Sequence, residues 1–177
     1  SKNAPDYDAR SYLYQMTGVD LTAIPGMNAI LVQKVLAEVG LDMACFPTVK
    51  HFCSWLGLAP HNAISGGRIL YSHTLHTNNR AGQAFRMAAQ AVSRGKTVYS
   101  EFYRRIRARS GPKEAIVATA HKIARTFYFV LKRRQPFHCM DIETFLRIKR
   151  EKDLHRLQSQ ATKFGLQLLP CPARIMS

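Results

Sequence analysis

The sequence predicts a mostly α-helical protein, and three observations support this fold class. Apolar residues recur at helical spacing in several segments, for example in 112–133. Residues that favour helix starts, such as Thr48 and Thr97, precede such segments, and Gly40 and Gly165 follow two of them. The 177 residues, of which 46% are hydrophobic, are enough for one domain with a core of ordinary size.

The first forty residues predict a short helix followed by a helix-hairpin-helix-like segment. Residues 6–16 favour a helix that ends at Gly18, and residues 21–24 favour a single helical turn that Pro25-Gly26 breaks. A second helix is expected to follow and to end at Gly40. Its apolar residues at helical spacing are Ile30, Leu31, Val35 and Val39.

The turn of this helix-hairpin-helix-like segment, residues 20–40, is a candidate contact with DNA. Gly26 supplies the backbone freedom that such a turn needs, and the amides that begin the second helix can bind a phosphate. Asn28 occupies the position at which many such hairpins have a second glycine. The surrounding residues 1–60 have a net charge of −1, so simple packing of two helices is the alternative role.

The middle of the chain predicts loops and a short extended segment. Residues 41–47 favour a loop, and Thr48 favours a helix through Leu56 that Gly57 ends. Residues 60–67 are rich in Pro, Asn, Ser and Gly, which predicts another loop. Because residues 68–75 alternate weakly, a short β-hairpin or loop is expected around residues 66–76.

A bundle of helices is expected from residue 80 onward. The predicted helices span 80–93, 98–109, 112–133 and 141–164. The first of them has a row of small side chains, which favours close helix packing: Ala81, Ala84, Ala88 and Ala91. The third has an apolar face and an opposite basic face. The basic face contains Lys122, Arg125 and Lys132.

Nearly all of the excess positive charge lies in one block of the chain. Lys and Arg number 26 against 11 acidic residues, for a net charge of +15. Residues 61–134 alone have 15 basic and two acidic side chains, a net charge of +13. Such a concentration indicates a polyanionic partner, most often a nucleic acid. The aromatic and basic run 99–109, which contains Arg104 and Arg105, is one segment that can follow a phosphate backbone.

Ser65 is the candidate nucleophile, in the segment Ser65-Gly66-Gly67-Arg68. Two glycines after a serine allow the hydroxyl to be presented without steric cover, and an arginine pairs well with phosphoryl oxygens. Nucleophilic chemistry on a phosphodiester also needs a proton acceptor, for which His61, His73 and His76 are near in sequence. The alternative is an ordinary turn serine, which is common in Ser-Gly-Gly loops.

The sequence predicts no metal site within the chain. His73 with His76 and His138 with Cys139 are the only pairs with a metal-like spacing, and no second pair completes a zinc set. Two-metal phosphoryl chemistry needs several convergent carboxylates, whereas the basic block has only Glu101 and Glu114.

Membrane insertion and secretion are not expected. The longest apolar stretches, such as 29–32, are far too short to cross a bilayer, and residues 1–10 do not resemble a signal peptide. Cysteine spacing fits neither a metal site nor a dense disulfide scaffold. The cysteines are Cys45, Cys53, Cys139 and Cys171. The expected location is therefore the cytoplasm.

Taken together, these motifs resemble the C-terminal transposase domain of insertion-sequence transposases whose N-terminal half carries a DEDD acid tetrad. The pilin-gene-inverting recombinases are members of the same family. The resembling segments run in order through nearly the whole chain: 17–26, 52–60, 64–68, 79–90, 102–109, 118–125 and 153–165.

The resemblance implies DNA strand exchange, with Ser65 as the nucleophile that forms a transient phosphoserine link. It implies that four acidic residues of an N-terminal domain bind Mg²⁺. The implied partners are the element DNA, the target DNA and an element-encoded RNA, and the full-length protein is expected to be a homo-oligomer. The residues expected to bind DNA are Gly26, Asn28, Gly66, Gly67, Arg68, Arg80, Arg86, Arg104, Arg105, Lys122 and Arg125.

The domain organisation that follows has three parts. Residues 1–17 would end a helical linker from a missing N-terminal domain, residues 18–165 would form the catalytic domain, and residues 166–177 would form a tail. As a fragment without the acidic domain, the chain is expected to be inactive. The alternative function is a non-catalytic nucleic-acid-binding module, or the remnant of a degenerate element.

Overall fold

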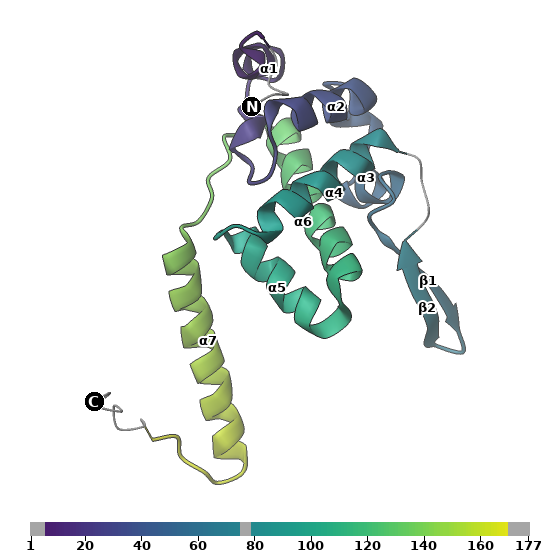
Figure 1. Ribbon diagram of the computed structural model, residues 1–177. Coiled ribbons are helices and arrows are strands. Elements are labelled where there is room, and N and C mark those ends of the chain that lie inside the picture. Colours follow the sequence, from purple (N-terminus) through teal and green to yellow (C-terminus); the bar gives the residue numbers. More distant parts are fainter. Residues whose placement is uncertain (1–5, 75–78, 170–177) are drawn as a thin grey trace. The chain divides into compact units, whose positions relative to one another are not determined.

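The computed structural model describes residues 6–74 and 79–169, and it is mostly α-helical, as the sequence predicts. The chain divides into two compact units, Ser1–Cys139 and Met140–Ser177 (Figure 1). The first unit contains helices α1 to α6 and a β-hairpin, and the second contains helix α7.

The N-terminal helices begin and end close to the predicted positions. Helix α1 is followed by a 3₁₀ turn, η1, and Gly18 caps α1 in the left-handed conformation with a φ of 72°. The 41–47 segment, expected to be a loop, contains a second 3₁₀ turn, η2. The bounds are α1 Ala9–Thr17, η1 Leu21–Ala23, α2 Ala29–Val39, η2 Met43–Cys45 and α3 Val49–Trp55.

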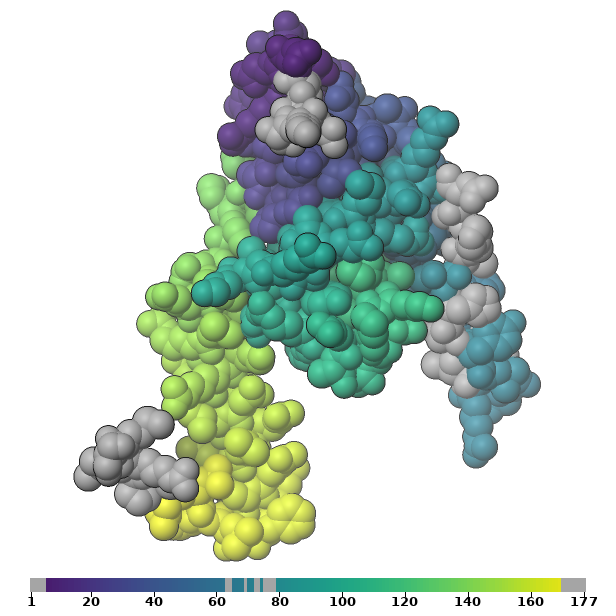
Figure 2. Space-filling view, viewed as in Figure 1, coloured from purple at the N-terminus to yellow at the C-terminus, as the bar shows by residue number. Residues whose placement is uncertain are grey.

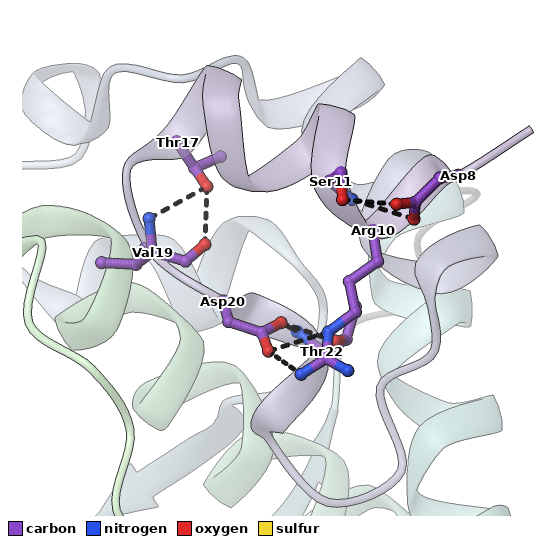
Figure 3. A network of polar contacts seen from close by, with 7 residues as sticks. All are labelled: Asp8, Arg10, Ser11, Thr17, Val19, Asp20 and Thr22. Atoms are coloured by element: carbon purple, nitrogen blue, oxygen red, sulfur yellow. Dashed lines mark hydrogen bonds and ion pairs between the residues drawn. The ribbon is translucent and has the colours of Figure 1, made fainter.

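A network of polar contacts joins α1 to η1 (Figure 3). The Arg10 guanidinium pairs with the Asp20 carboxylate, whose other oxygen accepts a hydrogen bond from the backbone N–H of Thr22 at 3.0 Å. The buried Thr17 hydroxyl lies 2.7 Å from the carbonyl of Leu13 and 2.8 Å from that of Val19. These contacts stabilise the sharp change of direction at Gly18 and position the start of η1.

The β-hairpin is longer than expected and begins earlier. Strands β1 (Pro60–Ser65) and β2 (Arg68–Thr74) pair antiparallel, from Pro60 opposite Thr74 to Ser65 opposite Arg68. The prediction of a loop over residues 60–67 is therefore wrong, because backbone pairing with β2 overrides the low strand propensity of Pro, Asn and Ser. A register shift between Ala63 and Ile64 interrupts the ladder.

The three helices that follow the hairpin match the sequence prediction to within one residue. They are α4 Arg80–Ser93, α5 Val98–Ser110 and α6 Pro112–Arg133. The Asn79 side chain caps α4 by accepting a hydrogen bond from the N–H of Gly82 at 2.9 Å. A capping box between Thr97 and Ser100 begins α5, and Pro112 occupies the first turn of α6.

Helix α4 lies at the centre of the core and packs on both α2 and α6. Ala81, Ala84 and Ala88 of the predicted small-residue row are buried, whereas Ala91 is exposed. Small side chains let neighbouring backbones approach closely: a Cβ on Gly82 would lie 2.3 Å from the carbonyl oxygen of Leu56. The end of α3 is therefore in direct backbone contact with α4.

Aromatic rings from three helices fill the space between α3, α4 and α6. The ring centre of Phe85 lies 6.2 Å from that of Phe52 and 5.4 Å from that of Phe127, in edge-to-face geometry. The Tyr128 ring lies 5.7 Å from Phe52, and its hydroxyl donates a hydrogen bond to the carbonyl of Phe46 at 2.9 Å. This cluster joins α3 and α6 through the core.

The second unit consists mainly of α7, Ile142–Lys163, which Asp141 caps and Gly165 follows. None of the residues of α7 is buried. Over the residues that the structure describes, no helix combines the length and the apolar character needed to cross a membrane.

The turn between η1 and α2 depends on a glycine that packs against α4. Gly26 has a φ of 86°, and a Cβ there would lie 2.5 Å from the carbonyl oxygen of Ala88 and 2.7 Å from Cγ1 of Val92. Both the conformation and the available space exclude a larger residue.

We expect Gly26→Ala to lower the free energy of unfolding by more than about 2 kcal/mol, because backbone strain and a clash with α4 add together. Urea unfolding followed by circular dichroism measures the change. Gly40→Ala is the matched control, since Gly40 also has a positive φ, 78°, but a Cβ there would meet nothing within 4 Å. Equal losses for the two variants would contradict close packing of the turn on α4.

Burial of Cys53 gives a second prediction. Burial raises the pKa of its thiol to about 11, against a smaller opposing effect of Arg125. Iodoacetamide at pH 8 should therefore alkylate the exposed Cys45 and spare Cys53 until the protein unfolds, as peptide mass spectrometry would show.

The same shift has a consequence for stability above pH 9. The thiol of the unfolded chain ionises before that of the folded chain, so the contribution of Cys53 to stability is lost as the pH rises from about 9 to about 11. Cys53→Ala should reduce this slope in urea unfolding. Native-state alkylation of Cys53 at the rate of Cys45 would refute its burial.

Candidate nucleic-acid interface

The candidate nucleophile lies at the tip of the β-hairpin. Ser65 and Arg68 are the last paired residues of β1 and β2, and Gly66 and Gly67 form the two-residue connection. Both glycines have positive φ values, 54° and 74°, as the tight turns that suit a hairpin require. All four residues are exposed, and Figure 2 shows the hairpin extending beyond the surface of the helices.

This geometry brings a hydroxyl and a guanidinium to one end of a two-stranded ribbon. The glycines have nothing within 4 Å of where a Cβ would lie, so the tip is open to a ligand from several directions. No hydrogen bond joins the Ser65 hydroxyl or the Arg68 guanidinium to another of the residues that the structure describes. Both groups are therefore available to a phosphate.

His61 does not complete this site. His61 pairs with position 73 in the ladder, four residues from Ser65 along β1, which is about 13 Å at the usual rise of a strand. The side chain of His73 and the whole of His76 lie outside the described residues. Their role as proton acceptors for Ser65 stays a prediction, and His61 is too far from the tip to act on Ser65 in this conformation.

The predicted DNA contact at Gly26 and Asn28 has a structural function in the protein. Gly26 packs on α4, as described above. Asn28 has an extended backbone, with a φ of −99°, and its side-chain oxygen accepts a hydrogen bond from the N–H of Leu31 at 2.9 Å. One of the amides that could hold a phosphate is thus already paired within the protein, and DNA contact here stays a prediction.

The two arginines predicted on α4 differ in their surroundings. The half-buried Arg86 donates a hydrogen bond to the carbonyl of Gly57 at 2.9 Å, which connects α4 to the end of α3. Arg80 has a side chain that is 87% exposed, and its guanidinium lies 3.8 Å from the Glu38 carboxylate. Of the two, Arg80 is the more exposed, and a ligand would have to compete with Glu38 for its guanidinium.

Arg104 and Arg105 are both exposed on α5, but only Arg105 is without a carboxylate partner among the described residues. Arg104 pairs with Glu101 and donates a hydrogen bond to the carbonyl of Gly95 at 2.8 Å. The Arg105 guanidinium lies 5.4 Å from the ring centre of Phe102. Such a contact orients the cation without neutralising its charge.

Lys122 and Arg125 of α6 complete a cluster of positive charge with Arg105. Burial lowers the pKa of Lys122, and the nearby Arg105 and Arg125 lower it further. Because these shifts arise partly from repulsion between like charges, the three groups are close enough to interact. The structure thus brings together three of the residues that the sequence predicts to bind nucleic acid.

His121 was not predicted as a site residue, yet it lines two pockets beside this cluster. One pocket, of about 420 Å³, is lined by His121, Lys122 and Arg125 together with aromatic residues. Burial, and to a smaller extent Arg125, lower the pKa of His121, so its imidazole is neutral at pH 7. His121 lies in the resembling segment 118–125, but no role was assigned to it, because the pockets form only when α5 packs beside α6.

The described residues do not provide a site for Mg²⁺. Across residues 6–74 and 79–169, no three His, Cys, Asp or Glu side chains come close enough together to hold a metal ion. Glu101 of the basic block already pairs with Arg104. The carboxylate set required by two-metal chemistry therefore does not fit this part of the protein.

Comparison with known proteins identifies relatives. Two curated proteins, each named pilin gene-inverting protein, come from Moraxella bovis and Moraxella lacunata, and each is 30% identical to this chain over 124 residues. The aligned stretch covers 66% of this chain but only 37% of each relative, so the chain corresponds to little more than a third of their length.

A match to a protein family covers much of the region just described. It spans residues 20–104, which extend from the turn before α2 through the hairpin and α4 into α5. The match therefore includes Ser65 and Arg68, whereas Lys122 and Arg125 lie beyond it. Residues 20–104 match the transposase family IS116/IS110/IS902, so this part of the chain is similar to those transposases.

Proposed function

We propose that this chain is the strand-exchange part of a DNA transposase or inversion recombinase, with Ser65 as the nucleophile. The observation that supports it best is the hairpin tip, where Ser65 and Arg68 pair across Gly66 and Gly67 and are both exposed. The match to the transposase family and the resemblance of the Ser-Gly-Gly segment to that of serine-nucleophile transposases add to it.

The shape of the hairpin suits contact with duplex DNA. A two-stranded β-ribbon has the width that the major groove of B-DNA admits, and an exposed tip can reach the backbone beside the groove. At the tip, the Arg68 guanidinium is suited to bind two oxygens of one phosphate. Ser65 lies directly opposite Arg68 in the ladder, and in this proposal its hydroxyl would lie near that phosphate.

The proposed reaction exchanges one phosphate ester for another. The Ser65 hydroxyl loses its proton to a base, a bond forms between Oγ and phosphorus, and one ester bond between phosphorus and a deoxyribose oxygen breaks. That oxygen leaves as a hydroxyl after it takes up a proton. A hydroxyl of a second strand then attacks the phosphoserine, which restores a DNA phosphodiester and releases the serine.

Arg68 stabilises the charge that builds up on the phosphoryl oxygens during each step. The metal comes from elsewhere in this proposal, because the described residues offer no cluster of ligands for it. His73 and His76 stay the predicted candidates for the base. We assign Mg²⁺ binding to an acidic domain of the complete transposase. The division of this chain into residues 1–17, 18–165 and 166–177 stays a prediction with it.

The remaining charge serves nucleic-acid binding in this proposal. Residues 61–134 have a net charge of +13, and Arg80, Arg105, Lys122 and Arg125 are positioned to contact phosphates. The partners proposed are the element ends, the target DNA and an element-encoded RNA, held by a homo-oligomer of the complete transposase. The salt dependence of binding should be steep, because each phosphate contact releases counterions.

We expect Ser65→Ala to abolish the covalent protein–DNA adduct and to reduce recombinant product by at least about 10³-fold, because no other group replaces the nucleophile. The complete transposase, mixed with its element DNA, RNA and Mg²⁺, is assayed by denaturing gel for the adduct and by sequencing for the product.

Ser54→Ala is the matched control, since Ser54 is also exposed but lies on α3. It should leave both measurements unchanged. An adduct or product of normal yield from Ser65→Ala would exclude Ser65 as the nucleophile and would support a non-catalytic nucleic-acid-binding module instead.

Arg68 gives a separate test of phosphate stabilisation. Arg68→Ala should lower the rate of adduct formation by about 10²–10³-fold, the usual effect of removing a donor to a reacting oxyanion. Arg68→Lys should recover part of this loss, because it retains the charge without the planar pair of donors. If Arg68→Ala changes DNA affinity but not the rate at saturating DNA, Arg68 only binds the substrate.

A further inference from the structure

A hollow between α5 and α6 combines aromatic walls with unneutralised positive charge. We call it the α5–α6 hollow and define it by Phe102, His121, Lys122, Arg125, Thr126 and Phe129. It has a volume of about 420 Å³, within the range of sites that hold small organic molecules. A neighbouring pocket of about 510 Å³ shares Phe102 and His121 with it and continues to Pro60 and Thr74 at the base of the hairpin.

The cations of this hollow are held in place by aromatic rings. The Lys122 ammonium lies 4.7 Å from the ring centre of Phe102 and 5.5 Å from that of Tyr99. The Arg105 guanidinium lies beside the same Phe102 ring, at 5.4 Å. Because ring faces attract cations without cancelling their charge, these contacts orient Lys122 and Arg105 and leave both positively charged toward a ligand.

No acidic side chain neutralises this cluster within the described part of the chain. Arg105, Lys122 and Arg125 form no ion pair with a described carboxylate, although Lys122 is half-buried. Like charges that are partly removed from water destabilise the protein, and a bound anion relieves the repulsion. The surroundings of Lys122 therefore favour an anionic ligand.

The other residues that line the hollow suit a ligand larger than a simple anion. Phe102 and Phe129 line the hollow, and the imidazole of His121 adds a hydrogen-bonding group. The Thr126 hydroxyl is already hydrogen-bonded to the Tyr99 hydroxyl at 2.8 Å and to the carbonyl of Lys122 at 3.2 Å. Inorganic phosphate would use only the cations. A ligand with both a phosphate and a flat aromatic ring would use the cations and the walls together.

We propose that the α5–α6 hollow binds an unpaired nucleotide of a single-stranded nucleic acid. The base lies against the aromatic walls, and the phosphates contact Lys122, Arg125 and Arg105. A duplex cannot fill the hollow in this way, because its bases are stacked and paired inside the helix. The inference rests on the proposed function, for which it specifies a single-stranded region of DNA or RNA as one ligand.

Fluorescence anisotropy with this chain tests the proposal. The probes are labelled dT20, rU20 and a 20-base-pair duplex, each measured at the same series of salt concentrations. The first two distinguish DNA from RNA as the source of the unpaired strand. We expect the double variant Lys122→Gln/Arg125→Gln to lose at least about tenfold in affinity for a single strand.

The matched control is Arg94→Gln/Lys96→Gln, which removes two exposed positive charges outside the hollow. Its loss for single strands should be no more than about threefold, and both double variants should affect the duplex equally. Phe102→Leu keeps an apolar side chain and removes the ring. It should weaken single-strand binding without changing the salt dependence, and circular dichroism verifies that each variant is folded.

Two results would overturn the inference while leaving the proposed function intact. The first is an equal loss of single-strand affinity in the two double variants. The second is a single-strand affinity that Phe102→Leu leaves unchanged. Absence of salt-dependent binding to every probe, the duplex included, would instead contradict the proposed function, and the inference would fail with it. Loss confined to rU20 would assign the hollow to RNA, and loss confined to dT20 would assign it to DNA.

Discussion

Close backbone contact with α4 is the constraint on which the rest of the first unit depends. Gly82 lets the carbonyl of Leu56 approach α4. Gly26 lets the turn before α2 approach α4 near Ala88. Arg86 adds a hydrogen bond to the carbonyl of Gly57. These contacts set where α3 ends, and with it where the chain leaves the helices to begin β1 at Pro60. The location of the candidate nucleophile thus depends on how α3 packs on α4, away from the hairpin tip itself.

Helix α6 connects this core to the basic surface. Its Ile123 and Phe127 are fully buried, whereas Lys122 and Arg125, one residue before and two after Ile123, face the α5–α6 hollow. The core side holds the helix in register, so the charged side is presented in a fixed arrangement. Removing charges from this surface should therefore alter ligand binding more than folding, because their contacts lie outside the hydrophobic core.

The helices could be predicted from sequence because their signals are local. Thr97 caps the helix that it precedes, as expected, and Pro112 begins α6. Asn79, which was not predicted as a cap, does the same for α4. Strand β1 could not be predicted, since its stability comes from pairing with β2 rather than from its own residues. Likewise, the charge of Lys122 predicted it as a nucleic-acid contact. Its contact with Phe102 on another helix could not be predicted, because it depends on tertiary packing. Ser65 and Arg68 were predicted together from their shared segment, and the structure adds that they lie opposite each other in the ladder.

The isolation of the hairpin determines when its tip is well positioned. Two strands joined by a Gly-Gly turn, with no third strand beside them in the described part of the chain, form a ribbon of marginal stability in water. In the proposed function, a bound nucleic acid would supply the contacts that fix the orientation of the tip. In the proposed reaction, a serine on such a ribbon would be aligned for attack only while the correct substrate is bound to the hairpin. The protein would thereby be protected from breaking DNA that it meets by chance.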